Sequence, residues 1–357
     1  MAHQWRGVIR EYFDRLPVDS STPIITLGEG GTPLVEAPRL AELVGAERVL
    51  LKVEGMNPTG SFKDRGMTMA VSKAIGKGAK AVICASTGNT SASAAAYAAA
   101  AGIASVVLIP EGKIAMGKLS QAVAHKAQIL QVQGNFDDCL DLARHLSDNY
   151  PVFLVNSVNP DRIEGQKTGA FEVVESLGFA PDLHVLPVGN AGNYSAYFKG
   201  YSEDLAEGTI KKLPQMWGFQ AEGSAPFTVG HPVKNPETIA TAIRIGNPAS
   251  WDLAQNAREV SGGRFGAVSD QQILWMHRFL SQEVGVFVEP SSATGAAGLY
   301  QQAQQGEKLA GKTIVVTVTG HGLKDSGWAL KDEAGADIQP QSVPNNAAEV
   351  AERLGLA

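Results

Sequence analysis

Lys63 is the residue in this sequence with the clearest capacity for covalent chemistry. It lies in the segment NPTGSFKDRG, residues 57–66, which is typical of a tight turn that leads into a helix. Ser61 and Asp64 have the spacing of a capping box, which predicts a helix that starts at Ser61. The positive end of that helix would lie beside the Lys63 amine, and this field, like burial, disfavours the ammonium form. Lys63 could then attack an aldehyde as a neutral amine, and the alternative is a solvated lysine in a first helical turn.

A polar loop with the sequence STGNTS, residues 86–91, is the second candidate for chemistry. It follows an expected strand and opens an alanine-rich helix. Its backbone amides, its hydroxyls and the Asn89 carboxamide would face one point, which suits a carboxylate or a ring hydroxyl as the ligand. Alternatively, Ser86 or Thr87 only caps the helix.

Two further loops follow apolar segments that are typical of strands. The first has the sequence GNAGN and consists of Gly189, Asn190, Ala191, Gly192 and Asn193. Its glycines would let backbone amides surround a phosphate group at the start of the next helix, although it is neither a Walker loop nor a GxGxxG dinucleotide loop. The second contains Thr319, whose hydroxyl could donate a hydrogen bond to a ring nitrogen or could belong to a plain turn.

These four features together describe a site for pyridoxal phosphate. The cofactor needs a lysine that forms an imine, a cradle for phosphate, an amide beside the ring and a hydroxyl for the ring nitrogen. In open α/β sheets, ligands bind beyond the carboxyl ends of the strands, which is where these loops are expected. The combination is far more specific than its parts, and it predicts pyridoxal 5′-phosphate as the cofactor.

The elements that must position these loops alternate between strand and helix. From Leu50 onward, short β-branched runs alternate with helical patterns. This order predicts an α/β fold with two open, mostly parallel twisted sheets and helices on both faces. Strands are expected at residues 49–53, 80–84, 104–109, 129–132, 152–155, 183–188, 215–219 and 313–318. Helices are expected at residues 61–76, 89–101, 117–127, 136–149, 161–177, 192–205, 270–284 and 292–305.

The same order predicts how the chain divides into domains. Residues 56–154 are expected to form a smaller domain on the substrate side. Residues 1–55 and 155–330 are expected to form a larger, cofactor-binding domain. The segment 331–357 contains the stretch DIQPQSVPNN at residues 337–346 and is expected to be a loose tail that ends in a short helix.

Composition excludes several classes of function. The chain has 357 residues and a net charge of −6, without a cluster of lysine or arginine, so a nucleic-acid partner is not expected. Cys84 and Cys139 are the only cysteines and the 7 histidines are scattered, which argues against a disulfide framework and against a metal site. No segment has the apolar length of a signal peptide or a membrane span, which predicts a cytoplasmic protein without membrane contact.

Four segments give the chain a resemblance to a known group of enzymes. They are GEGGTPL at residues 28–34, NPTGSFKDRGM at 57–67, STGNT at 86–90 and GNAGN at 189–193. In these segments the chain resembles the fold-type-II pyridoxal phosphate enzymes of the tryptophan synthase β group, and most closely the threonine synthase family. The resemblance extends over about residues 22–330.

The resemblance implies a role for each residue around the cofactor. Lys63 would hold the cofactor as an internal imine, and Asn89 would bond the 3′ oxygen of its ring. The loop at 189–193 would bind the phosphate group, and Thr319 would face the pyridine nitrogen. A hydroxyl partner, unlike a carboxylate, would leave that nitrogen largely unprotonated, which suits elimination and replacement chemistry better than transamination.

The resemblance also implies a reaction, the conversion of O-phospho-L-homoserine and water to L-threonine and phosphate. This is a lyase reaction, a γ-elimination followed by addition of water at the β carbon, and it is the last step of threonine biosynthesis. Ser86, Thr87 and Thr90 would hold the substrate carboxylate, and Thr87 would also steer the reaction specificity.

Such a substrate carries a phosphate of its own and therefore needs a second anion site. Asn156, Ser157 and Arg162 offer one, because arginine can bind phosphate with two parallel hydrogen bonds and the other two side chains can add neutral ones. The alternative is that Arg162 forms an ion pair at the surface.

Other functions remain as alternatives. Threonine or serine dehydratases share the lysine and glycine loops, but they handle no substrate phosphate and typically have serine in place of Thr319. Cysteine synthase is a further relative. Outside enzymes, the alternative is an inert pyridoxal phosphate binding protein, against which the intact set of residues argues. The family implies a homodimer.

Overall fold

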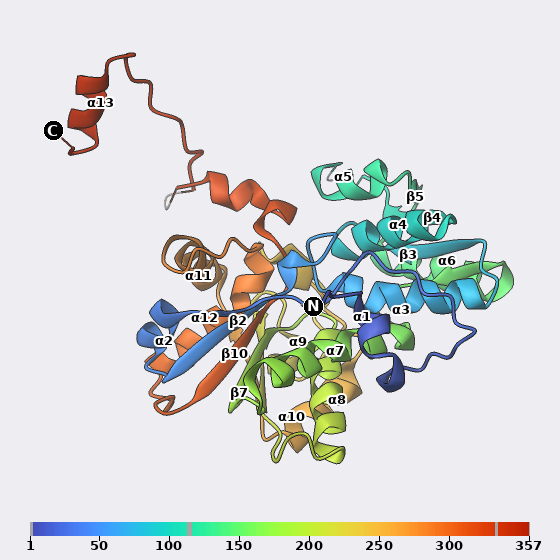
Figure 1. The fold of residues 1–357 in the computed structure, drawn as a ribbon. Coiled ribbons are helices and arrows are strands. Elements are labelled where there is room, and N and C mark those ends of the chain that lie inside the picture. Colours follow the sequence, from blue (N-terminus) through green and yellow to red (C-terminus); the bar gives the residue numbers. More distant parts are fainter. Residues whose placement is uncertain (1–2, 113–115, 333–334, 357) are drawn as a thin grey trace. The chain divides into compact units, whose positions relative to one another are not determined.

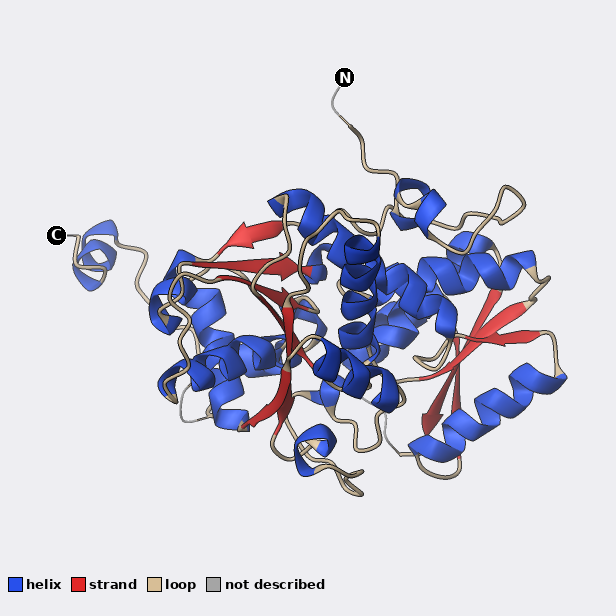
Figure 2. Cartoon of the chain, turned by 90° about the horizontal axis from the view of Figure 1, so that it is seen from below, coloured by secondary structure: helices blue, strands red, loops and turns tan. Residues whose placement is uncertain are grey.

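The fold is seen in a computed structural model, which describes residues 3–112, 116–332 and 335–356. The chain consists of two compact units, Met1–Asp325 and Ser326–Ala357. The first unit contains two separate groups of strands with helices around them, as Figure 2 shows. Among the described helices, none combines the length and the apolar character needed to cross a membrane.

The larger sheet has six strands in the order β1-β2-β10-β7-β8-β9. Only β1 runs antiparallel to its neighbour, and the other pairs are parallel. The strands are β1 (Leu34–Glu36), β2 (Arg48–Val53), β7 (Leu183–Pro187), β8 (Gln215–Ala221), β9 (Arg264–Val268) and β10 (Thr313–Val318).

Both faces of the larger sheet are buried. In β10, Ile314, Val316 and Val318 pack into one hydrophobic cluster, while Val315 packs into the cluster on the opposite face. Successive side chains of a strand point to opposite faces, so a strand covered on both sides is apolar throughout. Figure 1 shows α2, α11 and α12 on one side of this sheet and α7, α8 and α10 on the other. These helices are α2 (Pro38–Val44), α7 (Pro160–Leu177), α8 (Gly192–Ala206), α10 (Trp251–Val260), α11 (Asp270–Gln282) and α12 (Pro290–Gln304).

The smaller sheet has four parallel strands in the order β5-β4-β3-β6. Val82 and Cys84 of β3 face a cluster that includes helices α3 and α4, and Ile83 faces a cluster that includes α6. The strands are β3 (Ala81–Ala85), β4 (Ala104–Pro110), β5 (Gln128–Val132) and β6 (Val152–Leu154). The helices are α3 (Lys63–Gly76), α4 (Asn89–Ala101), α5 (Met116–Ala124) and α6 (Phe136–Asn149).

The remaining elements are short. They are the α-helices α1 (Val8–Glu11), α9 (Pro226–Val229) and α13 (Ala347–Arg353) and the 3₁₀ turns Phe13–Arg15, Glu54–Met56, Thr241–Ile243, Gly322–Lys324 and Ser326–Leu330. The predicted short helix near the end of the chain is α13, and residues 333–334 and 357 of the predicted tail lie outside the described residues.

The predicted α/β fold with two mostly parallel sheets is confirmed, and each predicted strand and helix has a counterpart in it. The sequence patterns missed β1, β9, α1, α2, α9 and α10. β1 is three residues long, too short to show alternation, and Gly266 interrupts the apolar pattern of β9. We propose the division into residues 56–154 and residues 1–55 with 155–330, which is supported by the membership of the strands in the two sheets, and we propose 331–357 as a tail.

Candidate active site

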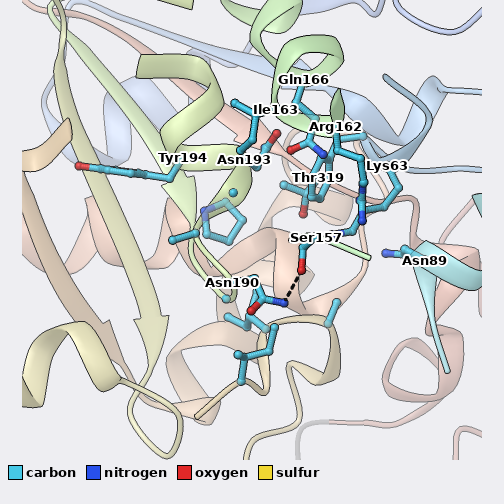
Figure 3. A pocket seen from close by; sticks show the side chains of 18 of the residues that line it. Lys63, Asn89, Ser157, Arg162, Ile163, Gln166, Asn190, Asn193, Tyr194 and Thr319 are labelled. Carbon is cyan, nitrogen blue, oxygen red and sulfur yellow. Dashed lines mark hydrogen bonds between the residues drawn. The ribbon is translucent and has the colours of Figure 1, made fainter. Parts of the chain in front are cut away.

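One pocket brings together loops that are far apart in the sequence (Figure 3). Lys63 reaches it from the first residue of α3, Asn89 from the first residue of α4, and Thr319 from the residue after β10. The predicted residues that also line it are Ser157, Arg162, Gly189, Asn190, Ala191, Gly192 and Asn193. These loops follow the carboxyl ends of parallel strands, where ligands bind in sheets of this kind.

Four predicted substrate residues do not line this pocket. Ser86, Thr87 and Thr90 flank the start of α4 beside it. The carboxamide of Asn156 pairs with the backbone of Ala85 in both directions, with its Oδ1 accepting from the amide and its Nδ2 donating to the carbonyl, each at 2.9 Å. Asn156 therefore holds the end of β3, from which the loop 86–91 departs.

The predicted capping box at Ser61 is wrong, and α3 begins two residues later, at Lys63. The Asp64 carboxylate accepts instead from the amide (2.7 Å) and the hydroxyl (2.6 Å) of Thr59, and no partner of the buried Ser61 hydroxyl is found among the described residues. The reason is tertiary. Ser61 pairs with Gly320 in an antiparallel bridge, and this extended pairing prevents Ser61 from capping the helix while placing Lys63 next to the loop of Thr319.

The environment of Lys63 favours the neutral amine. Burial is the main cause that lowers its pKa to about 7, the charge of Arg162 lowers it further, and Glu289 opposes both. An amine with this pKa is about half neutral at pH 7, so it can attack an aldehyde there. The prediction of a neutral amine is supported, with burial and the charge of Arg162 as the causes in place of the expected helix dipole.

The loop 189–193 has the features of a phosphate cradle. Ala191 adopts left-handed backbone angles with φ 63° and directly precedes α8. Its side chain forms no hydrogen bond that caps the first turn of this helix. Both polar atoms of the buried Asn193 carboxamide lack partners within the described part of the chain. A Cβ at Gly189 would lie 3.0 Å from the Ile243 Cα, which is tighter than ordinary packing. The backbone amides here are thus open to an anion at the positive end of α8.

Asn190 uses its side chain for a different purpose. Its Nδ2 donates to the Ser157 hydroxyl at 3.0 Å, and its Oδ1 accepts from the Ala249 amide at 3.1 Å. The loop at the start of α8 and the segment that leads into α7 are therefore joined by a direct hydrogen bond, which Figure 3 marks.

Arg162 lies in the first turn of α7, is 1% exposed, and donates from Nη1 to the Val155 carbonyl at 3.2 Å. Its Nε and Nη2 have no hydrogen-bond partner among the residues that the structure describes. Burial lowers the pKa of Arg162 to about 10. The alternative of a surface ion pair is excluded by this burial, and a buried cation in this state calls for an anionic ligand.

A buried ionic cluster fixes α3 and α7, which carry Lys63 and Arg162. Arg65 donates to Glu54 at 2.7 Å and to Glu172 at 2.7 Å, and Lys52 donates to Glu172 at 2.6 Å. The charges of Arg65 and Lys52 outweigh burial and lower the pKa of Glu172 to about 2. The two helices also touch where a Cβ on Gly165 would lie only 1.9 Å from the Arg65 carbonyl oxygen.

The sequence patterns missed two residues that face the predicted ring contacts. Asn89 donates from Nδ2 to the two carboxylate oxygens of Glu289, at 3.0 and 3.2 Å, and Glu289 also lines the pocket. The hydroxyl of Thr319 lies 2.9 Å from that of Ser292. An acidic residue before a proline that opens a helix, as at Glu289, is a signal that could have drawn notice.

The donor set fits a pyridine ring that carries an aldehyde and a phosphate. Lys63 supplies the amine, the start of α8 supplies open amides, and Asn89 and Thr319 supply an amide and a hydroxyl in the same pocket. The unpartnered carboxamide of Asn193 adds polar groups to the proposed phosphate end of the site.

Comparison with known proteins gives the same result. A family model described as pyridoxal-phosphate dependent enzyme matches residues 25–320. The chain is 59% identical over 356 residues to threonine synthase from Mycobacterium leprae, covering 99% of this chain and 98% of that protein. It is 56% identical over 332 residues to threonine synthase from Synechocystis, covering 93% and 86% of the two chains.

Solved structures share the fold at low sequence identity. Maize serine racemase superimposes with a TM-score of 0.70 at 21% identity, over 88% of this chain and 93% of that one. A fungal L-serine ammonia-lyase from Rhizomucor miehei superimposes with a TM-score of 0.70 at 22% identity, over 82% and 94% of the two chains. The chain belongs to the pyridoxal-phosphate-dependent enzymes and, within them, to the threonine synthase family.

Proposed function

We propose that this chain converts O-phospho-L-homoserine and water to L-threonine and phosphate. The observation that carries the proposal is Arg162, a buried guanidinium that lies in the same pocket as Lys63 and keeps two nitrogens without partners in the described chain. The start of α8 already offers a place for the cofactor phosphate. A second anion site in one pocket accounts for a substrate that carries a phosphate itself.

The residues divide the work as follows. When bound, pyridoxal phosphate supplies an electron sink for bonds at the substrate α carbon. Lys63 would hold the cofactor covalently, and its free amine would move protons at the α and β carbons of the substrate. Asn89 would face the 3′ oxygen of the ring and Thr319 its nitrogen.

Arg162 and Ser157 would bind the phosphate that leaves from the γ carbon. Ser157 is held in place by the Asn190 carboxamide at 3.0 Å. Because a charged donor with two free nitrogens stabilises phosphate more strongly than neutral groups do, Arg162 supplies the larger share of this binding.

The substrate carboxylate is proposed to lie at the start of α4, near Ser86, Thr87 and Thr90. The residue that precedes this helix, Gly88, has no side chain that could cap it, so amides of the first turn are open to an anion. Thr87 would also steer the reaction specificity.

A direct assay tests the proposal. We expect the purified protein, loaded with cofactor, to release phosphate and form threonine from O-phosphohomoserine in equal amounts. Ketoacid formation from threonine or serine is measured in parallel. If ketoacid production dominates, the protein is a dehydratase and the proposal is wrong.

We also infer a cytoplasmic homodimer. Cys84 and Cys139 are both buried free thiols, which is typical of proteins in a reducing compartment. Support for the dimer comes only from the family. Cell fractionation and light scattering of the purified protein test the two inferences separately.

A further inference from the structure

Two residues at the start of α12 contact both groups that are proposed to face the cofactor ring. Glu289 directly precedes α12 and binds Asn89, while Ser292, in the first turn of the helix, binds Thr319. Ser292 also accepts from the Gly320 amide at 2.8 Å, so the loop after β10 is tied to the same turn. One rigid helix start can therefore set the orientation of both ring contacts.

The Glu289 carboxyl group is held tightly in place. Its side chain is 4% exposed, and its backbone amide donates to the Gly320 carbonyl at 3.0 Å. A Cβ on Gly320 would lie 2.5 Å from the Glu289 Oε1, so glycine at this position makes room for the carboxyl group. The backbone and the carboxyl group of Glu289 are thus both held in place beside Asn89.

The chemistry of the pair determines which way Asn89 faces. An ionised carboxylate only accepts hydrogen bonds, so the amide nitrogen of Asn89, not its oxygen, must face Glu289. Figure 3 shows this nitrogen on the side of Asn89 that faces the cavity with Lys63. The two oxygens of one carboxylate can share one hydrogen of the amide, which leaves the second hydrogen of the nitrogen for another acceptor.

We propose that Glu289 is a positioning residue that keeps Asn89 a hydrogen-bond donor toward the 3′ oxygen of the cofactor ring and so holds that oxygen as an anion. Without Glu289, the carboxamide can rotate and present its oxygen. A carbonyl oxygen only accepts hydrogen bonds, so next to the ring oxygen it favours the protonated form of that oxygen, a hydroxyl that can donate. Burial raises the pKa of Glu289 above its ordinary value, and the hydrogen bond from Asn89 opposes this shift.

The inference rests on the proposed position of the cofactor and not on the identity of the substrate. It is therefore tested without substrate, from the absorption of the bound cofactor. When the ring oxygen is an anion, the cofactor linked to Lys63 absorbs in the visible. When the proton moves from the linking nitrogen to that oxygen, the band shifts to the near ultraviolet.

The experiment compares Glu289→Gln and Glu289→Ala with the unsubstituted protein at one pH. We expect the ratio of visible to near-ultraviolet absorption to fall in both variants, and the cofactor affinity of the apoprotein to weaken about tenfold, as for the loss of one hydrogen bond to a charged group. Glu283→Gln, at the exposed end of α11, is the control for lost charge and should change neither value.

A second comparison separates positioning from general damage. If Glu289 acts through Asn89, Glu289→Gln should have no further effect on the spectrum in an Asn89→Ala background. An equal effect in both backgrounds, or an unchanged spectrum in Glu289→Gln, would overturn the inference. Thermal melting of each apoprotein identifies variants that fail to fold, and Glu289→Gln, which keeps the volume of the side chain, serves where Glu289→Ala does not fold.

Discussion

Replacing Arg162 with methionine tests the second anion site most directly. Two nitrogens of Arg162 have no partner in the described part of the chain and can form two charge-assisted hydrogen bonds with a phosphate. Each such bond contributes about 1.5 to 3 kcal/mol, so their loss should reduce kcat/KM for O-phosphohomoserine by roughly 10² to 10⁴. Arg162→Lys keeps the charge but not the planar pair of donors. Its kcat/KM should therefore lie between those of the unsubstituted protein and Arg162→Met.

The same substitution should stabilise the apoprotein. Burial lowers the pKa of Arg162 from its ordinary value to about 10, which corresponds to a cost of about 3 kcal/mol for keeping the side chain charged in the fold. The lowered pKa belongs to a cation, so this cost is fully present at pH 7, below the folded pKa, and declines only above pH 10. Methionine fills a similar volume without charge, so Arg162→Met should raise the free energy of unfolding, up to this amount.

Steady-state kinetics measure kcat/KM, titration measures the affinity for the cofactor, and thermal melting measures the stability of the apoprotein. Arg39→Met is the control, because Arg39 is exposed and its ion pair with Glu42 lies at the surface. A loss of kcat/KM smaller than about tenfold would refute the role of Arg162 in phosphate binding. An equal loss of cofactor affinity would show instead that Arg162 binds the cofactor, and a lower melting temperature would show that its charge is compensated in the fold.

The other predictions concern Lys63 and the contact between α3 and α7. Because the pKa of Lys63 is about 7 and only the neutral amine attacks an aldehyde, the rate of cofactor attachment to the apoprotein should rise with pH through 7 and then level off. Stopped-flow absorbance measures it, and Arg162→Met, which removes a neighbouring positive charge, should move the midpoint to higher pH. A midpoint near 10 in the unsubstituted protein would contradict the burial argument. Gly165→Ala should destabilise the fold by about 3 kcal/mol or more, since its Cβ would lie 1.9 Å from the Arg65 carbonyl oxygen. Gly327→Ala is the control and should not destabilise the fold, because a Cβ at Gly327 meets nothing within 4 Å. Equal melting temperatures for the two variants would show that α3 and α7 can move apart at little cost in free energy.

Local patterns in the sequence predicted much of the fold. Strands such as β7 and β10 are short apolar runs between helices, and their alternation with helical segments is enough to indicate parallel sheets. The start of α3 could not be predicted in the same way. Ser61 and Asp64 match a capping box, but Ser61 pairs with Gly320, which lies more than 250 residues further along the chain.

The reactive and ligand-binding groups of this protein can be identified from the sequence alone. The segment around Lys63, the polar loop with Asn89 and the GNAGN loop are contiguous motifs, because the tight turns that present an amine or backbone amides are built from neighbouring residues. Such motifs can be recognised before any fold is known.

How these groups act depends on contacts that are visible only in the folded protein. The pKa of Lys63 depends mainly on burial and on the charge of Arg162. Two nitrogens of Arg162 lack a partner among the described residues because of which acceptors the fold leaves near them, and Glu289 meets Asn89 across 200 residues of chain. Burial and electrostatic coupling act through space and depend on which distant segments meet, so the spacing of residues along the chain does not contain them.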